Sequence, residues 1–421
     1  MTLTEHAPRF VNLTQTYRGW RSYRSEALLW VTFGSAASIL FSIAVSQILL
    51  GIGLLLLLVD RPLIDVPPIQ MPVAFFVGWT IISDLLSGHP LAGMPQIRKF
   101  YVFGIVLLVS VALRTQVQLR ALLFAWTGIG VLSATSGFFH VLARHREAVR
   151  LKWNSYDFYL DDRIKGFAGH WMTFGAEQMI VLLCLLAYLL FSRNSRFRLI
   201  GWCCAACLWI SLMLGLTRSI FLLGVPVGVV YLLAAFRPWT LALLPVVALA
   251  SWFVMPFQVR ERVASAVSPH GELDSNAHRY VTRRTGWQMI KAHPWFGLGP
   301  EQVGRQFDAY VPPDIHRPLP HGWYGHLHNI YMQYAAERGV PALLFLLWLI
   351  GKMLADFGRA LWAGRLSEDR RYVVHAAIAV IGAILAEGFF EHNLGDSEVL
   401  TMFLIVTSMA YTTIRRAEPC S

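Results

Sequence analysis

Long runs of apolar residues dominate the chain, and only 14% of its 421 residues are charged. Soluble domains carry about a quarter charged residues, so this composition is that of an integral membrane protein. A transmembrane helix needs about 20 predominantly apolar residues to cross a hydrocarbon core about 30 Å thick. The sequence therefore predicts an all-α integral membrane fold with about twelve spans. The candidate spans are 27–43, 44–59, 71–88, 99–114, 119–141, 173–192, 197–216, 219–236, 239–257, 338–357, 372–390 and 397–414.

The first two spans are the least regular part of this pattern. As one helix, residues 27–59 would run about 50 Å at about 1.5 Å per residue. This length is too great for one tilted span and slightly short for two, so we expect a tight hairpin near Ser42 to Ser46. The count of twelve depends on that hairpin.

Arginine placement orients the spans, because loops on the cytoplasmic side carry an excess of Lys and Arg. With twelve spans, four arginine-bearing segments fall on one side, so both termini are expected in the cytoplasm. These segments hold Arg18, Arg21, Arg24, Arg193, Arg196, Arg198, Arg359, Arg365, Arg370, Arg371, Arg415 and Arg416. The N-terminus is polar, and its first apolar run is too long for a signal-peptide core, so no cleavable signal is expected.

One long polar segment separates two groups of spans. We expect a membrane bundle of about nine spans at 1–257, a large outer loop at 258–337 and a bundle of about three spans at 338–421. The outer connections 142–172 and 258–337 are basic, against the usual bias, which suggests an anionic ligand. Contact with lipid headgroups is the alternative. None of the five cysteines lies outside, so no disulfide framework is implied.

Several arginines stand where a phosphate could bind. Arg218 interrupts an apolar region at the junction of two spans, where an arginine costs a few kcal/mol unless it is paired, hydrated or snorkelling. Its guanidinium would suit bidentate phosphate recognition; a snorkelling anchor is the alternative. Helical spacing places Arg279 and Arg283 on one face and Arg284 and Trp287 on a neighbouring one. A solvated basic face is the alternative for these residues.

Four histidines end the polar segment: His316, His321, His326 and His328. His-x-His spacing recurs in zinc sites, although no cysteine or carboxylate falls at convincing spacing beside it. They could instead be ordinary loop histidines. One could also be a general base, because imidazole titrates near neutral pH. His328 lies where the loop enters the tenth span, near the membrane surface, which favours this third interpretation.

Polar residues also gather at the outer ends of other spans. Arg163, Lys165 and His170 lie just before the sixth span. Glu391 and Asp396 stand at the outer end of the eleventh, where a carboxylate could position a histidine or an acceptor hydroxyl. Ordinary polar loops with partial salt bridges are the alternative for each of these groups.

The segment that begins at His328 resembles the signature of the O-antigen ligase family. That signature is His, then Asn, Ser or Gln, nine residues, Gly, two residues, and finally Gly, Thr or Tyr. Here His328-Asn329 is followed by nine residues and then by Gly339-Val340-Pro341-Ala342, in which Ala342 departs from the last position.

Three earlier segments resemble further elements of the same family. Arg283 and Trp287, with the turn from Pro294 to Gly299, resemble its Arg-x3-Trp…Pro-x2-Gly-x-Gly stretch. The segment 163–173 resembles its Arg-x2-Gly…His element, and Arg218 resembles its arginine at a span junction. The four elements occur in one order and on one predicted side of the membrane, so together they are a fairly specific signal.

The resemblance implies a bacterial inner-membrane glycosyltransferase of the GT-C type, with a periplasmic active site. It would transfer the O-antigen glycan from undecaprenyl diphosphate to lipid A–core with inversion, without a metal, ATP or other cofactor. O-antigen polymerase and protein O-oligosaccharyltransferase, which use the same donor, are alternatives; a transporter of anionic lipids or solutes is a more distant one. Membrane lipids are expected contacts, and no nucleic acid is.

The expected roles follow from chemistry and resemblance together. Arginines would stabilise the negative charge that develops on the leaving diphosphate. The candidates are Arg163, Arg218, Arg283 and Arg284, with Arg279 as a further possibility. His328 would take the proton of the attacking hydroxyl, with His326 in reserve. Residues expected to stack on sugars or orient the substrates are His170, Trp287, Trp323, Tyr324 and Asn329.

Overall fold

A computed structural model describes residues 13–60, 66–193, 198–266 and 276–416, and these residues form helices without any strand. The N-terminal half contains α1 (Leu13–Ser38), α2 (Ile43–Asp60), α3 (Gln70–Leu86), α4 (Pro90–Lys99), η1 (Phe100–Phe103), α5 (Gly104–Ala112), α6 (Gln116–Leu151), α7 (Ser155–Asp161), α8 (Trp171–Phe191) and α9 (Arg198–Leu214). The remainder contains η2 (Ile220–Gly224), α10 (Val225–Phe236), η3 (Pro238–Ala242), α11 (Leu243–Val254), α12 (Phe257–Ala264), α13 (Asn276–Ala292), α14 (Val303–Gln306), η4 (Phe307–Tyr310), α15 (Ile330–Trp362), α16 (Glu368–Glu387), η5 (Asn393–Gly395) and α17 (Ser397–Arg415).

The helices agree with an integral membrane protein. Among the described residues, six helices are long and apolar enough to cross a bilayer, or up to seven if the bent pair Pro238–Phe253 and Phe257–Ala264 is one span. Three shorter apolar helices, Gln70–Leu86, Arg198–Leu214 and Ile220–Phe236, accompany them. Each of the predicted apolar segments overlaps a helix or a run of consecutive helices, although α1 and α16 are not among the spans and shorter apolar helices named above.

The predicted hairpin near the start of the chain is present, a few residues earlier than expected. Helix α1 ends at Ser38 and α2 begins at Ile43. The two helices pack together through Ser35 and Ser46, whose hydroxyls each donate to the other residue's carbonyl oxygen at 2.8 Å. Because these hydroxyls are buried, this reciprocal pair satisfies polar groups that would otherwise weaken the contact between the helices.

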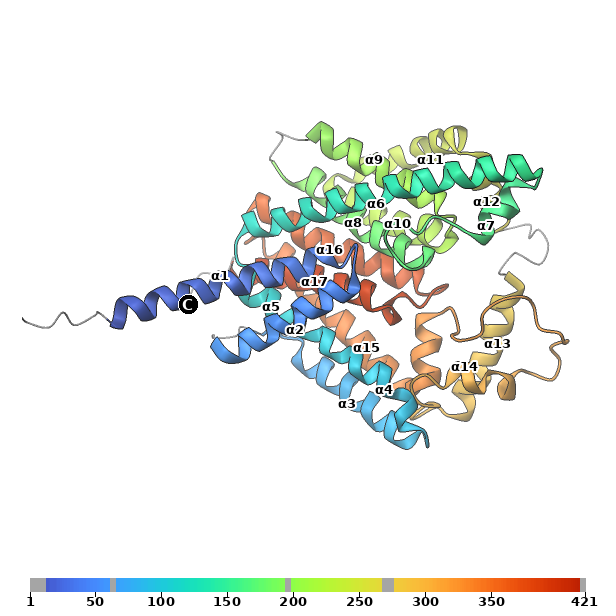
Figure 1. Cartoon of the computed structure of the whole chain (residues 1–421), viewed down its shortest axis with the longest axis horizontal. Coiled ribbons are helices and arrows are strands. Elements are labelled where there is room, and N and C mark those ends of the chain that lie inside the picture. Colours follow the sequence, from blue (N-terminus) through green and yellow to red (C-terminus); the bar gives the residue numbers. More distant parts are fainter. Residues whose placement is uncertain (1–12, 61–65, 194–197, 267–275, 417–421) are drawn as a thin grey trace, which may run out of the picture.

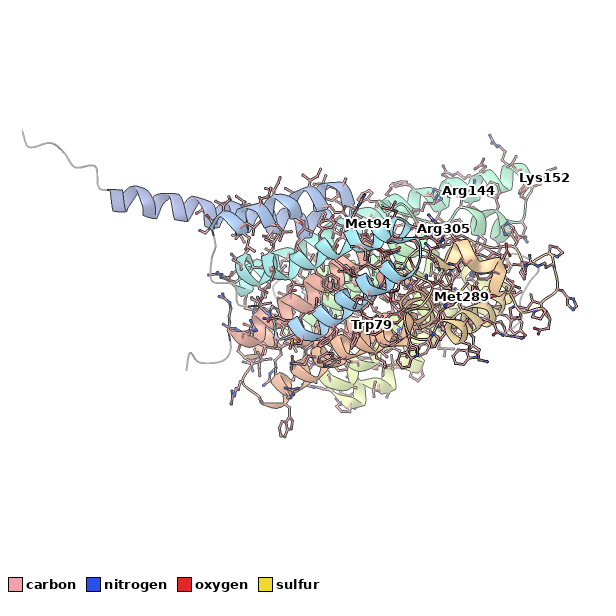
Figure 2. The ribbon with its side chains drawn as sticks, turned by 90° about the horizontal axis from the view of Figure 1, so that it is seen from below. Trp79, Met94, Arg144, Lys152, Met289 and Arg305 are labelled. Carbon is pink, nitrogen blue, oxygen red and sulfur yellow. The ribbon has the colours of Figure 1, made fainter. Side chains whose placement is uncertain are left out.

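Helices α8, α16 and α17 lie at the centre of the bundle, and most of their side chains are buried (Figure 1). The two connections that were predicted to lie outside the membrane gather at one end. Figure 2 places Arg144 and Lys152 of the first connection at the same end as Met289 of the second. Helix α1 extends beyond the bundle at the opposite end (Figure 1).

Helix α15 begins within the predicted polar loop and is broken at Gly339, whose φ is 81°. The turn after α13 fills this break. Leu298 N donates to Ala336 O, Gly299 N to Glu337 O and Val340 N to Pro294 O, each at 2.8 Å. These bonds satisfy backbone groups that the broken helix would otherwise leave without partners.

Helix α3 closes the same junction from the other side. Trp79 Nε1 donates to Trp295 O and to Arg338 O, both at 3.2 Å, and Ser83 Oγ donates to Phe296 O at 2.6 Å. The Trp79 ring also stacks on Phe296, with ring centroids 5.2 Å apart. The junction thus fixes the start of α15, and with it the position of His328, relative to the bundle.

Gly339→Ala is expected to prevent stable folding. A Cβ atom at this position would lie 1.8 Å from Trp295 O, and the positive φ is strained for any L side chain. Gly351→Ala, in the same helix, is the matched control because a Cβ there meets nothing within 4 Å. The yield of monodisperse protein after detergent extraction measures the effect. Equal yields for the two variants would contradict this explanation of the glycine.

Candidate active site

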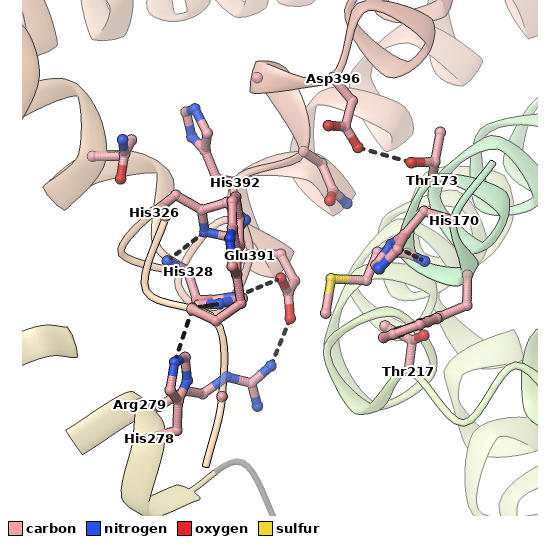
Figure 3. Close-up of a pocket in the computed structure, with 18 of the residues that line it drawn as sticks. His170, Thr173, Thr217, His278, Arg279, His326, His328, Glu391, His392 and Asp396 are labelled. Carbon is pink, nitrogen blue, oxygen red and sulfur yellow. Dashed lines mark hydrogen bonds and ion pairs between the residues drawn. The ribbon is translucent and has the colours of Figure 1, made fainter. Parts of the chain in front are cut away.

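A cavity of about 600 Å³ opens where the helix ends and the outer connections meet (Figure 3). Its walls come from α4, the connection between α7 and α8, the junction between α9 and η2, α12, α13, the segment before α15, and the connection between α16 and α17. The lining is rich in titratable side chains: Lys99, Arg163, His170, Arg218, Arg262, His278, Arg279, Glu301, His321, His326, His328, Glu337, Glu391, His392 and Asp396.

His328 stands at the start of α15, held there by the residue that follows it. Asn329 caps the helix: its side-chain oxygen accepts from Met332 N at 2.8 Å, and its amide nitrogen donates to Phe389 O at 3.0 Å. His328 itself has a φ of 48°, an uncommon backbone conformation for a non-glycine residue. The His-Asn pair thus combines a cavity-lining imidazole with a cap that fixes its orientation.

Glu391 bridges His328 and an arginine. Its Oε2 lies 3.2 Å from His328 Nδ1, and its Oε1 accepts from Arg279 Nη2 at 2.6 Å. Burial alone would raise the pKa of this carboxyl, but the hydrogen bond to His328 and the charge of Arg279 together hold the pKa at about 2. A carboxylate that accepts the Nδ1 proton leaves Nε2, which lies 3.4 Å from Trp323 O, as the basic nitrogen of the ring.

Three other histidines surround this pair and are held neutral. His326 Nδ1 accepts from His328 N at 3.1 Å, and burial lowers the pKa of His326 to about 2. Burial also lowers the pKa of His392 to about 3 and that of His278 to about 4. His278 Nε2 donates to Trp323 O at 3.0 Å. The hydrogen bond at Nδ1 and the lowered pKa make His326 a weak base.

The described part of the chain contains no group of three or more His, Cys, Asp or Glu side chains arranged to hold a metal ion. The nitrogens around His328 instead contact a carboxylate, a backbone amide and a carbonyl oxygen.

Four arginines from four different parts of the chain line the cavity: Arg163, Arg218, Arg262 and Arg279. Arg163 Nε donates to Leu160 O at 3.0 Å, and its guanidinium lies 4.9 Å from the Trp171 ring centroid. Burial and the nearby charge of Arg262 lower the pKa of Arg163 to about 9, so it remains a cation at neutral pH. Closely placed cations of this kind favour an anionic ligand.

Arg218 is buried, with 7% of its surface exposed. Its Nη1 donates to Ser265 O and its Nη2 to Asn276 Oδ1, both at 2.8 Å. Arg262 Nε donates to Leu216 O at 3.1 Å. The planar fork of Arg218 therefore ties α12 and the start of α13 to the junction before η2, while the residue also lines the cavity. It is more firmly held than a snorkelling side chain at a lipid surface would be.

Some of the predicted site residues line the cavity and others do not. Of the predicted residues, those that line it are Arg163, His170, Arg218, Arg279, Trp323, His326 and His328. His170 caps α8, with Nδ1 accepting from Met172 N at 3.2 Å, and burial lowers its pKa.

The other predicted residues have different surroundings. Arg283 lies over the Phe390 ring, 5.1 Å from its centroid, and Arg284 is bonded to Tyr280 and Asp314 on the surface of α13. Trp287 is 54% exposed. Tyr324 donates its hydroxyl to Pro320 O at 2.6 Å, and Asn329 acts as the helix cap described above. None of these five is among the residues that line the cavity.

Sequence reasoning gave no role to Arg262 or Lys99 and left the roles of Glu391 and Asp396 open. Both carboxylates belong to one short connection, and the structure directs Glu391 toward His328 and Asp396 toward Thr173 (Figure 3). The clustering of carboxylates at a span end was the available signal. No sequence signal pointed to Lys99, because it lies at the edge of an apolar run.

Residues 181–347 match the family model described as O-antigen ligase. The chain carries an O-antigen ligase family domain. This match confirms the resemblance seen in the sequence, and it contains Arg218, Arg279 and His328. A comparison with curated proteins found no match. The carboxylates of the α16–α17 connection lie beyond the matched residues of the O-antigen ligase domain.

Glu391→Gln is expected to lower stability in a pH-dependent way. The pKa of Glu391 is lowered from 4.5 to about 2, which corresponds to about 3 kcal/mol of folding stability. Because the folded-state pKa is lowered, this contribution is fully present above pH about 4.5 and is lost as the pH falls toward 2. The melting temperatures of wild type and variant in detergent should therefore differ most near neutral pH and converge as the pH falls toward 2. A difference independent of pH would contradict this.

Proposed function

We propose that the protein is an O-antigen ligase, which transfers a glycan from undecaprenyl diphosphate to lipid A–core. The acceptor hydroxyl oxygen attacks the anomeric carbon, and the bond from that carbon to the diphosphate oxygen breaks. The hydroxyl proton passes to Nε2 of His328, and the configuration at the anomeric carbon inverts. Undecaprenyl diphosphate leaves with the bonding electrons, so the new negative charge on its phosphate balances the proton held by the enzyme.

The observation that carries this proposal is the His328–Glu391–Arg279 chain beside three further arginines in one cavity. Glu391 holds Nδ1 of His328, which leaves Nε2 to act as the base. A positioned general base contributes about 10²–10⁴-fold to a rate. Arg163, Arg218 and Arg262 supply cations that would stabilise the departing diphosphate without a metal ion. The predicted roles of Arg283 and Arg284 receive no such support.

We also propose the membrane arrangement expected from the sequence. About twelve spans of the GT-C type would place both termini in the cytoplasm and the cavity on the periplasmic side of the inner membrane. The polar segment 258–337 would be the large periplasmic loop between bundles at 1–257 and 338–421. Support comes from the described residues of 142–172 and 258–337, which gather at the end that carries the cavity.

Reconstitution tests the proposal. Purified protein in liposomes is supplied with an undecaprenyl-diphosphate-linked glycan and either rough lipopolysaccharide or a second glycan-bearing lipid. We expect extension of lipopolysaccharide, with equal rates in the presence and absence of EDTA. Extension only of the glycan lipid would indicate the alternative, an O-antigen polymerase. Loss of transfer in EDTA that zinc restores would overturn the metal-free reaction.

A further inference from the structure

A second carboxylate in the cavity has surroundings unlike those of Glu391. Asp396 precedes α17, and its Oδ2 accepts from Thr173 Oγ1 at 2.9 Å. Both oxygens of Glu391 are engaged by Arg279 and His328, whereas the described residues provide no arginine bonded to Asp396. Burial raises the pKa of Asp396 to about 6, so it is ionised at neutral pH.

The cavity therefore has two chemically different sides. Figure 3 places Asp396 and Thr173 at one side, Thr217, the neighbour of Arg218 in the sequence, at the other, and Glu391 and His328 between them. The wall near Asp396 also includes Lys99, whose Nζ donates to Gly395 O at 2.9 Å. An ionised aspartate repels a diphosphate, so an anionic leaving group is favoured on the arginine side.

Inversion at the anomeric carbon determines the side from which the acceptor sugar approaches. In an inverting displacement the incoming hydroxyl approaches the anomeric carbon on the face opposite the leaving group. If the diphosphate lies among the arginines, the acceptor enters from the side that carries Asp396. A carboxylate is an acceptor-only group that suits sugar hydroxyls, and its hydrogen bonds to them are charge-assisted.

We infer that Asp396, oriented by Thr173, binds the hydroxyl groups of the acceptor sugar. The inference rests on the proposed transfer reaction and adds a substrate class to this side of the cavity. That class is a sugar ring presenting free hydroxyls, not a phosphate group. Asp396 is a binding residue in this role, and His328 remains the group that takes the proton.

The test measures the two substrates separately. In liposomes, Asp396→Asn should raise the KM for rough lipopolysaccharide about 10-fold or more and leave the KM for the lipid-diphosphate glycan within about twofold, because a charge-assisted hydrogen bond becomes a neutral one. Glu398→Gln is the matched control: this carboxylate lies in the first turn of α17 and does not line the cavity. An unchanged acceptor KM, or a change confined to the donor KM, would overturn the inference.

Binding without turnover separates this inference from the proposed reaction. Rough lipopolysaccharide is titrated into donor-free wild type and Asp396→Asn protein of equal thermal stability. Weaker binding by the variant supports the acceptor site even if wild type transfers nothing, in which case only the reaction fails. Equal binding by both proteins overturns the acceptor site even if wild type is an active ligase.

Discussion

His328→Ala is expected to reduce glycan transfer by about 10²–10⁴-fold while the protein still inserts and binds the lipid-diphosphate donor. Because Glu391 engages Nδ1, the His328 imidazole has Nε2, 3.4 Å from Trp323 O, to accept the proton. Glu391 cannot replace it efficiently, since a carboxyl with a pKa of about 2 is a weak base at neutral pH. Single-turnover transfer by reconstituted protein measures the effect.

His316→Ala is the matched control for this variant. His316 belongs to the same predicted polar segment, is exposed and does not line the cavity. It should transfer at the wild-type rate. His326→Ala provides a second comparison, because His326 was the reserve base and its ring lies beside that of His328, with centroids 4.0 Å apart. Wild-type transfer by His328→Ala together with loss in His326→Ala would reverse the assignment.

Arg218→Lys is expected to lower transfer by about 10-fold or more despite keeping the positive charge. The two ends of the guanidinium reach Ser265 O and Asn276 Oδ1 at the same time, and a lysine ammonium lacks this planar fork. The substitution should loosen the cavity wall formed by α12 and α13 as well as weaken diphosphate binding. Transfer assays on samples matched for thermal stability separate the catalytic effect from partial unfolding.

Arg284→Lys is the control for Arg218→Lys. Arg284 lies on the surface of α13, where it bonds to Tyr280 and Asp314 outside the cavity. Exposed pairs of this kind contribute little, so the variant should retain nearly full transfer. A loss at Arg284 as large as that at Arg218 would favour the original sequence prediction and place diphosphate binding on the surface of α13.

The helices were predictable because apolar runs of spanning length are a local property of the sequence. The hairpin after α1 was expected from length alone and missed by only a few residues. The break at Gly339 was harder, because it depends on the distant turn from Pro294 to Gly299 and on donors in α3. The family signature marked the glycine, but only the packing gives the reason for it.

The site was predictable in its components but not in its pairing. Helical periodicity separated Arg279 from Arg284 correctly, yet which face meets the cavity depends on where α13 packs, and a local pattern cannot reveal this. The partner of His328 is Glu391, 63 residues further along the chain. Their contact exists because the α16–α17 connection folds over the start of α15. Asn329, expected near the substrate, instead fixes the helix that carries His328.

The most direct test of the proposed roles, a histidine base and an arginine site for the diphosphate, compares donor binding with transfer in two variants. Fluorescent undecaprenyl-diphosphate glycan is titrated into reconstituted His328→Ala and Arg163→Ala protein, and transfer is then measured in the same samples. We predict that His328→Ala binds the donor like wild type without transferring it, whereas Arg163→Ala binds the donor about 10-fold or more weakly. Loss of donor binding in His328→Ala, or wild-type donor affinity in Arg163→Ala, would contradict the assignment of base and diphosphate site.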